Sequence, residues 1–382
     1  MNSNNTGKLH RETSRITDLV WIQTSFIGDI VLSTGAFRLA RECIPGVRQH
    51  VVTTGPGERV LAGSTSIDSL TTFRKSGLGF GAMNDVRARI HGLVHAAGGR
   101  QDSTVTLLPH RSFRSGLLAR RLGYRSIAYA DTPAGLLATE TVPRVAVLHE
   151  TSRVALLLEP LGAGREEILA ARPHLDRRVS PPLSSDVKAM AGIPANPGWL
   201  QTLADWPGRV IGVVPGSKWG TKRWTPAGFV QLISDLLVDP DNLVVLICAD
   251  DERVLCGTIA EGVHARGGSV RPVANLVNLA GATTLDELRS LYPELDLIVT
   301  NDSSSIHYAS AFNVPTVAVF GATVPAMGFG PLASRSASVG IDLSCRPCSD
   351  HGPEVCPLGH FRCMKDLAVS KVLQTCRDIL AM

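Results

Sequence analysis

The start of the chain alternates between short apolar runs and stretches with helical spacing. Residues 18–23 (DLVWIQ) have the composition of a buried strand, residues 30–41 have the apolar spacing of a helix, and residues 49–53 form another apolar run. A polar turn, residues 24–29, separates the first strand from the helix. Residues 149–161 again have helical spacing and are followed by a glycine. Strand, turn, helix and strand in this order predict a doubly wound α/β domain.

The second half of the chain starts the same pattern again. A proline-rich stretch, residues 181–208, predicts a linker before it. Thr225 is a good N-cap and Pro226 suits the first helical position, so a helix is predicted to begin there. Further strands are predicted at residues 210–214, 243–249, 295–300 and 316–320. We therefore predict two α/β domains, in which ligands bind at the carboxyl ends of the strands.

Length, composition and charge indicate a globular protein of more than one domain and argue against several other classes of protein. A length of 382 residues suits two or three domains, and 44% apolar with 19% charged residues is ordinary for a globular protein. The sequence contains no run of about 18 apolar residues, so no membrane-spanning helix is predicted. The first fifteen residues are polar and do not resemble a secretory signal. A net charge of +4 and 5% aromatic residues argue against nucleic acid as the main partner.

The first turn places Asp29 directly after Gly28 at the start of a helix. The helix dipole and free backbone N–H groups favour an ionised carboxylate there. We expect Asp29 to be charged at neutral pH and able to act as a general base. A capping aspartate without chemistry is the other interpretation.

The turn at residues 215–224 (PGSKWGTKRW) brings three cations in front of a helix: Lys218, Lys222 and Arg223. This arrangement suits a phosphate or pyrophosphate, although it is not a Walker A loop. An exposed basic loop without a ligand is the alternative.

The turn at residues 301–307 (NDSSSIH) combines small hydroxyl residues with Asp302 and His307. Its open backbone N–H groups suit a phosphate, and Asp302 could accept a hydrogen bond from a sugar hydroxyl. His307 lies one helical turn further on, where a histidine without a ligand is also common. A fourth turn, residues 321–323, follows the last predicted strand.

Five arginines and no carboxylate lie between residues 103 and 130: Arg111, Arg114, Arg120, Arg121 and Arg125. A solvated helix face and a site for an anionic acceptor or an acidic membrane surface both fit this charge pattern. No GxGxxG follows the first strand, and HExxH and GxSxG are absent.

Three segments in order resemble glycosyltransferase family 9, the ADP-heptose:lipopolysaccharide heptosyltransferases. They are WIQTSFIGDIVLSTGAFRLAR, IGVVPGSKWGTKRWTPAGF and TNDSSSIHYASAFNVPTVAVFGAT. RSFRSGLLARRLGY and HETSRVALLLEPLG are also similar to the family, so the resemblance covers roughly residues 18–370. The subtype that this chain resembles most is heptosyltransferase II, which adds a heptose to a first heptose.

The resemblance implies a GT-B architecture, an α/β fold with two Rossmann-like domains facing each other across a cleft. The implied parts are a polar tail (1–17), an acceptor-binding domain (18–180), a linker (181–208), an ADP-sugar-binding domain (209–345), and a Cys-rich segment with a C-terminal helix returning toward the N-domain (346–382).

The resemblance also implies the reaction, which transfers L-glycero-D-manno-heptose from ADP-heptose to the lipopolysaccharide inner core (lipid A–Kdo–heptose). The anomeric carbon inverts, and no cofactor or metal is required. The implied location is cytoplasmic, peripheral on the inner face of the bacterial inner membrane.

Residue roles are carried over from the matching motifs. Asp29 would deprotonate the acceptor hydroxyl, and Lys222 would offset charge on the departing ADP. The implied donor-binding residues are Gly216, Ser217, Lys222, Asp302, Ser303, Ser304, His307 and Thr323, and the implied acceptor-binding residues are Ser25, Arg111 and Arg114. Ser304 stands where the family usually has glycine and Val324 where it often has aspartate, which leaves the donor sugar open.

Four of the eight cysteines lie close together with the spacing C-x2-C-x7-C-x6-C: Cys345, Cys348, Cys356 and Cys363. Four thiolates could hold a structural zinc or iron, as in a related branch of the family that glycosylates autotransporters. Reduced packing thiols are the other interpretation, because the second half of the motif lacks a metal knuckle.

Two alternative functions stay open at this point. A family member with the same fold could use another nucleotide sugar or a protein acceptor. A non-catalytic nucleotide-sugar-binding protein belongs to a different class, and the presence of both Asp29 and Lys222 argues against it.

Overall fold

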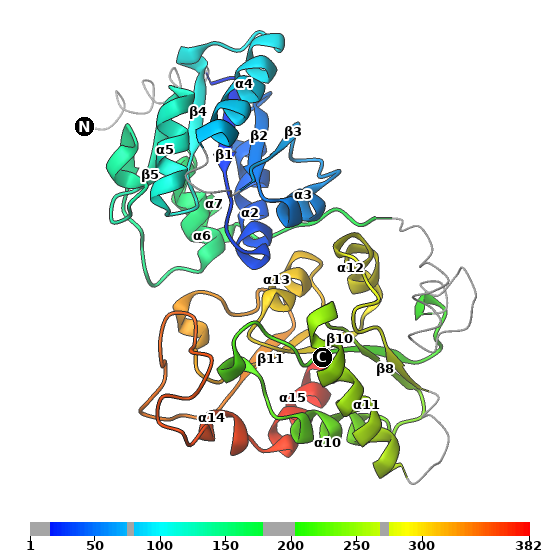
Figure 1. Ribbon diagram of the computed structural model, residues 1–382. Coiled ribbons are helices and arrows are strands. Elements are labelled where there is room, and N and C mark those ends of the chain that lie inside the picture. Colours follow the sequence, from blue (N-terminus) through cyan, green and yellow to red (C-terminus); the bar gives the residue numbers. More distant parts are fainter. Residues whose placement is uncertain (1–15, 75–79, 179–202, 268–274) are drawn as a thin grey trace. The chain divides into compact units, whose positions relative to one another are not determined.

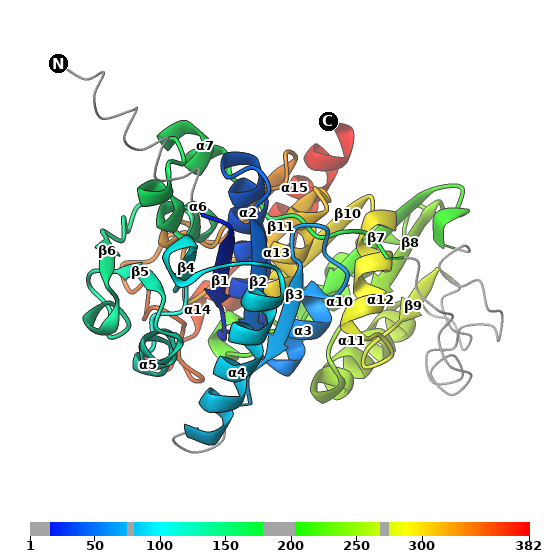
Figure 2. The ribbon, with the colours of Figure 1, turned by 90° about the horizontal axis from the view of Figure 1, so that it is seen from above.

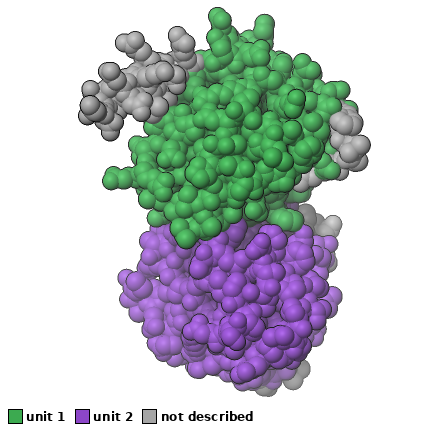
Figure 3. All heavy atoms as spheres, turned by 90° about the vertical axis from the view of Figure 1, so that its left-hand side faces the viewer, with its two compact units in different colours: residues 1–176 green, residues 177–382 purple. Residues whose placement is uncertain are grey.

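The computed structural model describes residues 16–74, 80–178, 203–267 and 275–382. The chain forms two compact units, residues 1–176 and 177–382, coloured separately in Figure 3. Residues 1–15 of the predicted tail and 181–202 of the predicted linker lie outside the described residues. Both units are α/β, as predicted from the sequence (Figure 1).

The first unit is built on a parallel sheet of six strands in the order β3-β2-β1-β4-β5-β6. This order can be followed across Figure 2 from β6 to β3. The strands are β1 (Asp18–Ile22), β2 (Arg48–Thr53), β3 (Ser69–Thr72), β4 (Thr104–Leu107), β5 (Arg125–Tyr129) and β6 (Glu140–Val142). The helices are α2 (Ile27–Cys43), α3 (Gly55–Leu61), α4 (Phe80–Ala96), α5 (Phe113–Leu122), α6 (Glu150–Ala155) and α7 (Arg165–Ala170).

Strand β1 is buried on both faces, which explains why its sequence is almost continuously apolar. Val20 and Ile22 pack against α4 and α5, whereas the Trp21 ring lies 4.9 Å from Phe37 of α2, centroid to centroid. The indole N–H of Trp21 donates to Gln49 Oε1 (2.8 Å), so its polar atom is satisfied inside the core.

The second unit has a parallel sheet in the order β12-β11-β10-β7-β8-β9. Its strands are β7 (Arg209–Val214), β8 (Asn242–Leu246), β9 (Leu276–Asn278), β10 (Leu297–Asn301), β11 (Thr316–Val319) and β12 (Ser336–Val339). The helices are α10 (Pro226–Leu236), α11 (Arg253–Arg266), α12 (Leu285–Leu291), α13 (Ser304–Ala311), α14 (Arg362–Lys365) and α15 (Val369–Ala381). Apolar side chains of α10, α11 and α15 cover the same core as strands β7, β8, β10 and β11.

The start of α10 follows the predicted capping residue, whereas α2 begins at Ile27, within the stretch 24–29 that was predicted as a turn. Thr225 Oγ1 accepts a hydrogen bond from Gly228 N (3.1 Å) at the start of α10, with Pro226 in its first turn. One helix prediction was wrong in part. The stretch 149–161 is α-helical only as far as Ala155 and continues as a 3₁₀ helix, because Pro160 has no N–H for an α-helical hydrogen bond.

Short 3₁₀ helices complete both units: Gln101–Ser103, Gly135–Leu137, Leu156–Leu161, Gly220–Lys222, Asp250–Glu252, Tyr292–Glu294 and Pro325–Met327. Among the described residues, no helix is long and apolar enough to cross a membrane.

Candidate functional site

Asp29 lies in the first turn of α2, directly after the carboxyl end of β1. Its pKa is raised from 3.8 to about 6, first by burial and then by the charge of Glu150, whereas the Phe26 backbone N–H, Arg111 and the Ser25 side chain act in the opposite direction. A pKa of about 6 agrees with the expected charge at neutral pH, although desolvation of the half-buried carboxylate outweighs the effect of the helix start on the pKa. The carboxylate is still ionised at neutral pH.

Glu150 and Arg153 of α6, with Arg144, form a buried charge cluster that sequence reasoning missed. Glu150 Oε2 lies 2.8 Å from Arg153 Nη1 and 3.1 Å from Arg144 Nη2. Helix α6 packs closely on α2 at Gly35, where an added Cβ would lie 2.7 Å from Thr151 Cγ2. This close packing brings the negative charge of Glu150 within electrostatic range of Asp29.

The turn after β4 carries the predicted arginines. Arg111 is exposed and precedes the N-cap Ser112, and Arg114 lies in the first turn of α5, so only Arg114 belongs to the helix. His110 Nδ1 is hydrogen-bonded to Thr24 Oγ1 (2.8 Å), which ties this turn to the one after β1. Strands β1 and β4 are adjacent, which explains how the two turns meet.

Ser25 was predicted to bind the acceptor. Its hydroxyl donates to the side-chain carbonyl of Gln23, the buried residue that follows β1. This contact holds the turn between β1 and α2 next to Asp29.

In the second unit, Lys222, Asp302 and Thr323 come together from the turns after three adjacent strands, β7, β10 and β11. Lys222 Nζ lies 2.7 Å from Asp302 Oδ2, and Thr323 Oγ1 donates to the same oxygen at 2.5 Å. All three side chains are largely buried. The structure therefore brings together one cation, one carboxylate and one hydroxyl that the sequence had placed in separate turns.

The loop after β7 is held at several points by the turn after β10. Asn301 Nδ2 donates to Pro215 O (2.7 Å), and its side-chain oxygen accepts from Trp224 N (3.0 Å). Ser217 Oγ donates to Asp302 O (3.1 Å). Asn301 thus bridges both ends of the loop 215–224, a role that the sequence did not indicate.

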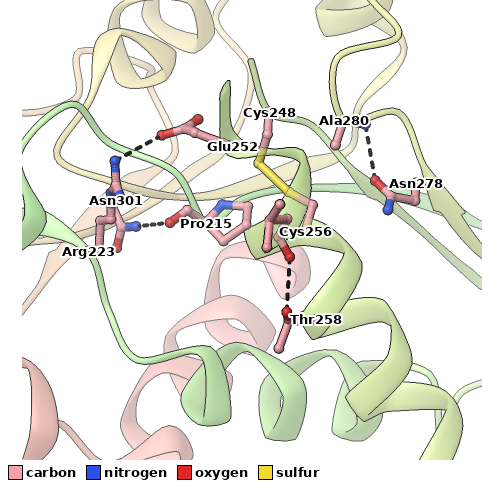
Figure 4. Close-up of a disulfide and its surroundings, with 10 residues drawn as sticks. Pro215, Arg223, Cys248, Glu252, Cys256, Thr258, Asn278, Ala280 and Asn301 are labelled. Atoms are coloured by element: carbon pink, nitrogen blue, oxygen red, sulfur yellow. Dashed lines mark hydrogen bonds and ion pairs between the residues drawn. A yellow bond between two sulfur atoms is a disulfide. The ribbon is translucent and has the colours of Figure 1, made fainter. Parts of the chain in front are cut away.

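Glu252, at the turn after β8, is a second residue that sequence reasoning missed. Its carboxylate lies 3.7 Å from Arg223, and burial raises its pKa (Figure 4). A Cβ on Gly216 would lie 2.0 Å from Glu252 Oε2, so the loop passes directly against this carboxylate and a larger residue would have to displace it.

A disulfide joins Cys248, after β8, to Cys256 of α11, and brackets Glu252 (Figure 4). This pairing was not predicted, because the sequence pattern singled out only the four C-terminal cysteines. Both residues are buried, and their closeness depends on how α11 packs back on β8.

Helix α13 starts at Ser304, one residue after its N-cap. Ser303 Oγ accepts from Ser305 N (3.3 Å), and the buried His307 lies in the following turn, its ring 6.2 Å from the Phe329 ring, centroid to centroid. Ser303, Ser304 and Asp302 therefore line the N-terminal end of a helix, where backbone N–H groups favour an anion.

The four C-terminal cysteines influence one another electrostatically: burial, followed by Cys345 and Cys356, raises the pKa of Cys348. Cys345 Sγ lies 4.0 Å from His360 Nε2. Backbone N–H groups, that of Phe361 first, lower the pKa of Cys356. Over the described ranges, no three His, Cys, Asp or Glu side chains are arranged to hold a metal ion.

Residues 192–357 match the family model of glycosyltransferase family 9 (heptosyltransferase). Lipooligosaccharide heptosyltransferase 2 of Campylobacter jejuni is 30% identical over 174 residues, 45% of this chain and 51% of that protein. The chain spans about half the length of such curated relatives.

Two solved structures share the fold over nearly the whole chain. The glycosyl transferase family 9 protein of Veillonella parvula has a TM-score of 0.74 at 17% identity, covering 96% of this chain and 97% of that one. The ADP-heptose LPS heptosyltransferase II of E. coli has a TM-score of 0.71 at 19% identity, covering 96% and 99%. The resemblance predicted from the sequence and the two-domain α/β fold are both confirmed.

Proposed function

We propose that this relative of glycosyltransferase family 9 transfers heptose from ADP-heptose to the inner core of lipopolysaccharide. The observation that carries the proposal is the meeting of Lys222, Asp302 and Thr323 at the carboxyl ends of β7, β10 and β11. Parallel α/β sheets bind ligands at this edge, and a buried ammonium group next to a helix N-terminus suits a diphosphate. The match to the family model covers this same part of the chain.

On the donor side, Lys222 would neutralise the diphosphate of the sugar nucleotide, with the N–H groups at the start of α13. Asp302 holds the Lys222 ammonium in place and accepts from Thr323, which leaves its second oxygen for a hydroxyl of the sugar. A fixed cation of this kind can stabilise departing ADP without a bound divalent metal ion.

On the acceptor side, Asp29 would remove the proton of the attacking hydroxyl. The acceptor oxygen would form its bond to the anomeric carbon while the bond to the diphosphate breaks, and ADP would leave with the electron pair. One base and one displacement invert the anomeric carbon. A pKa of about 6 makes Asp29 a stronger base than an ordinary aspartate while keeping it ionised at pH 7.

Acceptor recognition would involve Arg111 and Arg114 in the turn after β4, through the acidic groups of the inner core. The same carboxyl edge carries large apolar side chains that are 55% to 85% exposed: Phe26, Phe113, Leu136 and Val147. They follow β1, β4, β5 and β6, so they lie at one edge of a parallel sheet. Apolar side chains beside arginines suit peripheral contact with an anionic membrane.

The test is transfer of heptose from ADP-heptose to a lipopolysaccharide acceptor that carries one heptose, comparing wild type with Asp29→Ala and Lys222→Ala. The matched controls are Asp85→Ala and Lys365→Ala, which remove exposed charges far from these turns in sequence. We expect turnover by wild type and both controls and its loss in both test variants. Full turnover by Asp29→Ala would refute the base assignment.

The choice of donor is tested in the same assay. If ADP-heptose is not turned over and another nucleotide sugar is, the heptose assignment is wrong and the family member with a different donor is correct. Nucleotide-sugar binding without turnover of any acceptor would instead support the non-catalytic binding protein.

Membrane contact is tested by flotation with anionic liposomes at low salt. Phe113→Glu should stay in the soluble fraction, whereas Leu169→Glu, an exposed leucine on α7, should float like wild type. Wild type that stays entirely soluble would contradict the membrane proposal.

A further inference from the structure

The Cys-rich segment, residues 345–363, is attached to the same turns that form the donor site. Cys348 N donates to Ala322 O (2.8 Å), Gly220 N donates to Glu354 Oε2 (3.3 Å), and the Thr221 hydroxyl donates to Pro353 O. In Figure 1 the segment is the orange-red chain that leads to α14. These contacts reach the turn after β7 and the turn after β11.

Arg346 links this segment to the chain after β11 and the chain after β12. Its guanidinium donates to Phe320 O (2.9 Å) and Thr323 O (2.8 Å), and also to Ile341 O. These carbonyls belong to the chain directly after β11 and to the chain after β12. All of its hydrogen-bond partners in the part of the chain that the structure describes are backbone carbonyls.

The two carbonyls at Phe320 and Thr323 bracket the turn 321–323. The guanidinium nitrogen Nη2 donates to both of these carbonyls and Nη1 donates to Ile341 O after β12, so Arg346 ties both ends of the turn to the neighbouring chain and fixes its orientation. The Thr323 hydroxyl at the end of the turn donates to Asp302 (2.5 Å), and Asp302 in turn holds Lys222 (2.7 Å). A shift of the turn would therefore reach the cation of the donor site through two short contacts.

We propose that Arg346 is a positioning residue for the donor site, which holds Thr323, and through it Asp302 and Lys222, in the geometry that binds the sugar nucleotide. The proposal rests on the proposed function, because it assigns the diphosphate to Lys222. It also assigns the Cys-rich segment a role, which is to brace the donor turns from outside the sheet.

The first measurement is the binding of ADP alone by isothermal titration calorimetry. Arg346→Ala removes three charge-assisted hydrogen bonds, two of them to the turn 321–323, and should weaken ADP binding about tenfold or more. In the transfer assay the donor KM should rise by a similar factor, with a smaller change in kcat. Arg346→Lys should recover part of the loss, because an ammonium can replace Nη2 at the carbonyls of the turn but lacks the second nitrogen that donates to Ile341 O.

The matched control is Arg362→Ala. Arg362 lies in the same segment, is exposed, and pairs with Asp366 four residues further on (2.7 Å). Its loss should leave the ADP affinity unchanged. If the segment only stabilises the fold, both substitutions should weaken ADP binding. If Arg346 positions the donor site, only Arg346→Ala should weaken it.

A double-mutant cycle with Thr323→Ala tests whether Arg346 acts on Asp302 and Lys222 through Thr323. If Arg346 acts through Thr323, the two substitutions are not additive, and the double variant binds ADP about as weakly as the weaker single variant. Wild-type ADP affinity in folded Arg346→Ala would overturn the proposal, as would full additivity. If Arg346→Ala does not fold, Arg346→Gln takes its place. Wild type that binds no ADP would instead refute the proposed function.

Discussion

The raised pKa of Asp29 predicts that this carboxylate lowers the stability of the folded protein at neutral pH. Its folded-state pKa is about 6, against an ordinary value of 3.8. Folding therefore favours the protonated form, and the free energy of unfolding falls as the pH rises from 3.8 through 6. A difference of about two pH units corresponds to about 3 kcal/mol, all of it present above pH 6.

Asp29→Asn removes the charge and keeps the shape of the side chain. The amide oxygen can still accept from the Phe26 backbone N–H, so we expect the variant to be more stable than wild type by about 1–3 kcal/mol at pH 8. Linkage predicts roughly half of that gain at pH 5, because wild-type Asp29 is then mostly protonated. The stabilised variant should also be inactive in heptose transfer.

The assay is urea unfolding of both proteins at pH 5, 6, 7 and 8, with Asp85→Asn as an exposed control. The gain must grow with pH between 5 and 7 and then level off. A difference that does not change with pH, or a variant less stable than wild type at pH 8, would refute the assignment of a buried, destabilised carboxylate.

Four further results are expected. Glu150→Gln should move the acidic limb of the kcat/KM profile to lower pH, because the charge of Glu150 raises the pKa of Asp29. The shift should be less than about one pH unit, since burial is the larger cause of the raised pKa. A limb at the wild-type pH would contradict this. Asn301→Ala should lower the free energy of unfolding by about 2 kcal/mol, since it leaves a buried donor and a buried acceptor unpaired, and urea unfolding checks it. Turnover should persist in EDTA because Lys222 supplies the positive charge at the donor site; activity that is lost in EDTA and recovered by an added divalent cation would contradict this. Metal analysis should find no metal bound to the C-terminal cysteines, which are then thiols; one zinc or iron per chain would contradict that expectation.

Much of the fold could be predicted from local patterns. The apolar run of β1, the N-cap Thr225 and the order of strands and helices all depend on nearby residues, so the sequence predicted two α/β units. Local patterns predicted the ends of helices and strands less accurately. The helix beginning after His149 changes to a 3₁₀ helix before Pro160, because one missing N–H outweighs the helical spacing.

The candidate site could be predicted as a set of turns but not as a set of contacts. Lys222, Asp302 and Thr323 were each identified in their own turn, and the strand order β11-β10-β7 then placed their side chains together. Glu150, Asn301 and Arg346 were missed, since a glutamate, an amide and an arginine carry no local signal of the carbonyls or charges that they meet.

The amino-acid sequence by itself determined the α/β class, several of the strands and helices, and the family that the chain resembles, because spacing, caps and motifs depend on neighbouring residues. Tertiary structure alone decided the ionisation of Asp29. Its helix start predicts a stabilised charge, but burial and Glu150 of α6 raise its pKa to about 6. Desolvation and long-range charge depend on which elements pack around a group, and residues more than a hundred positions apart become neighbours only when the sheet forms.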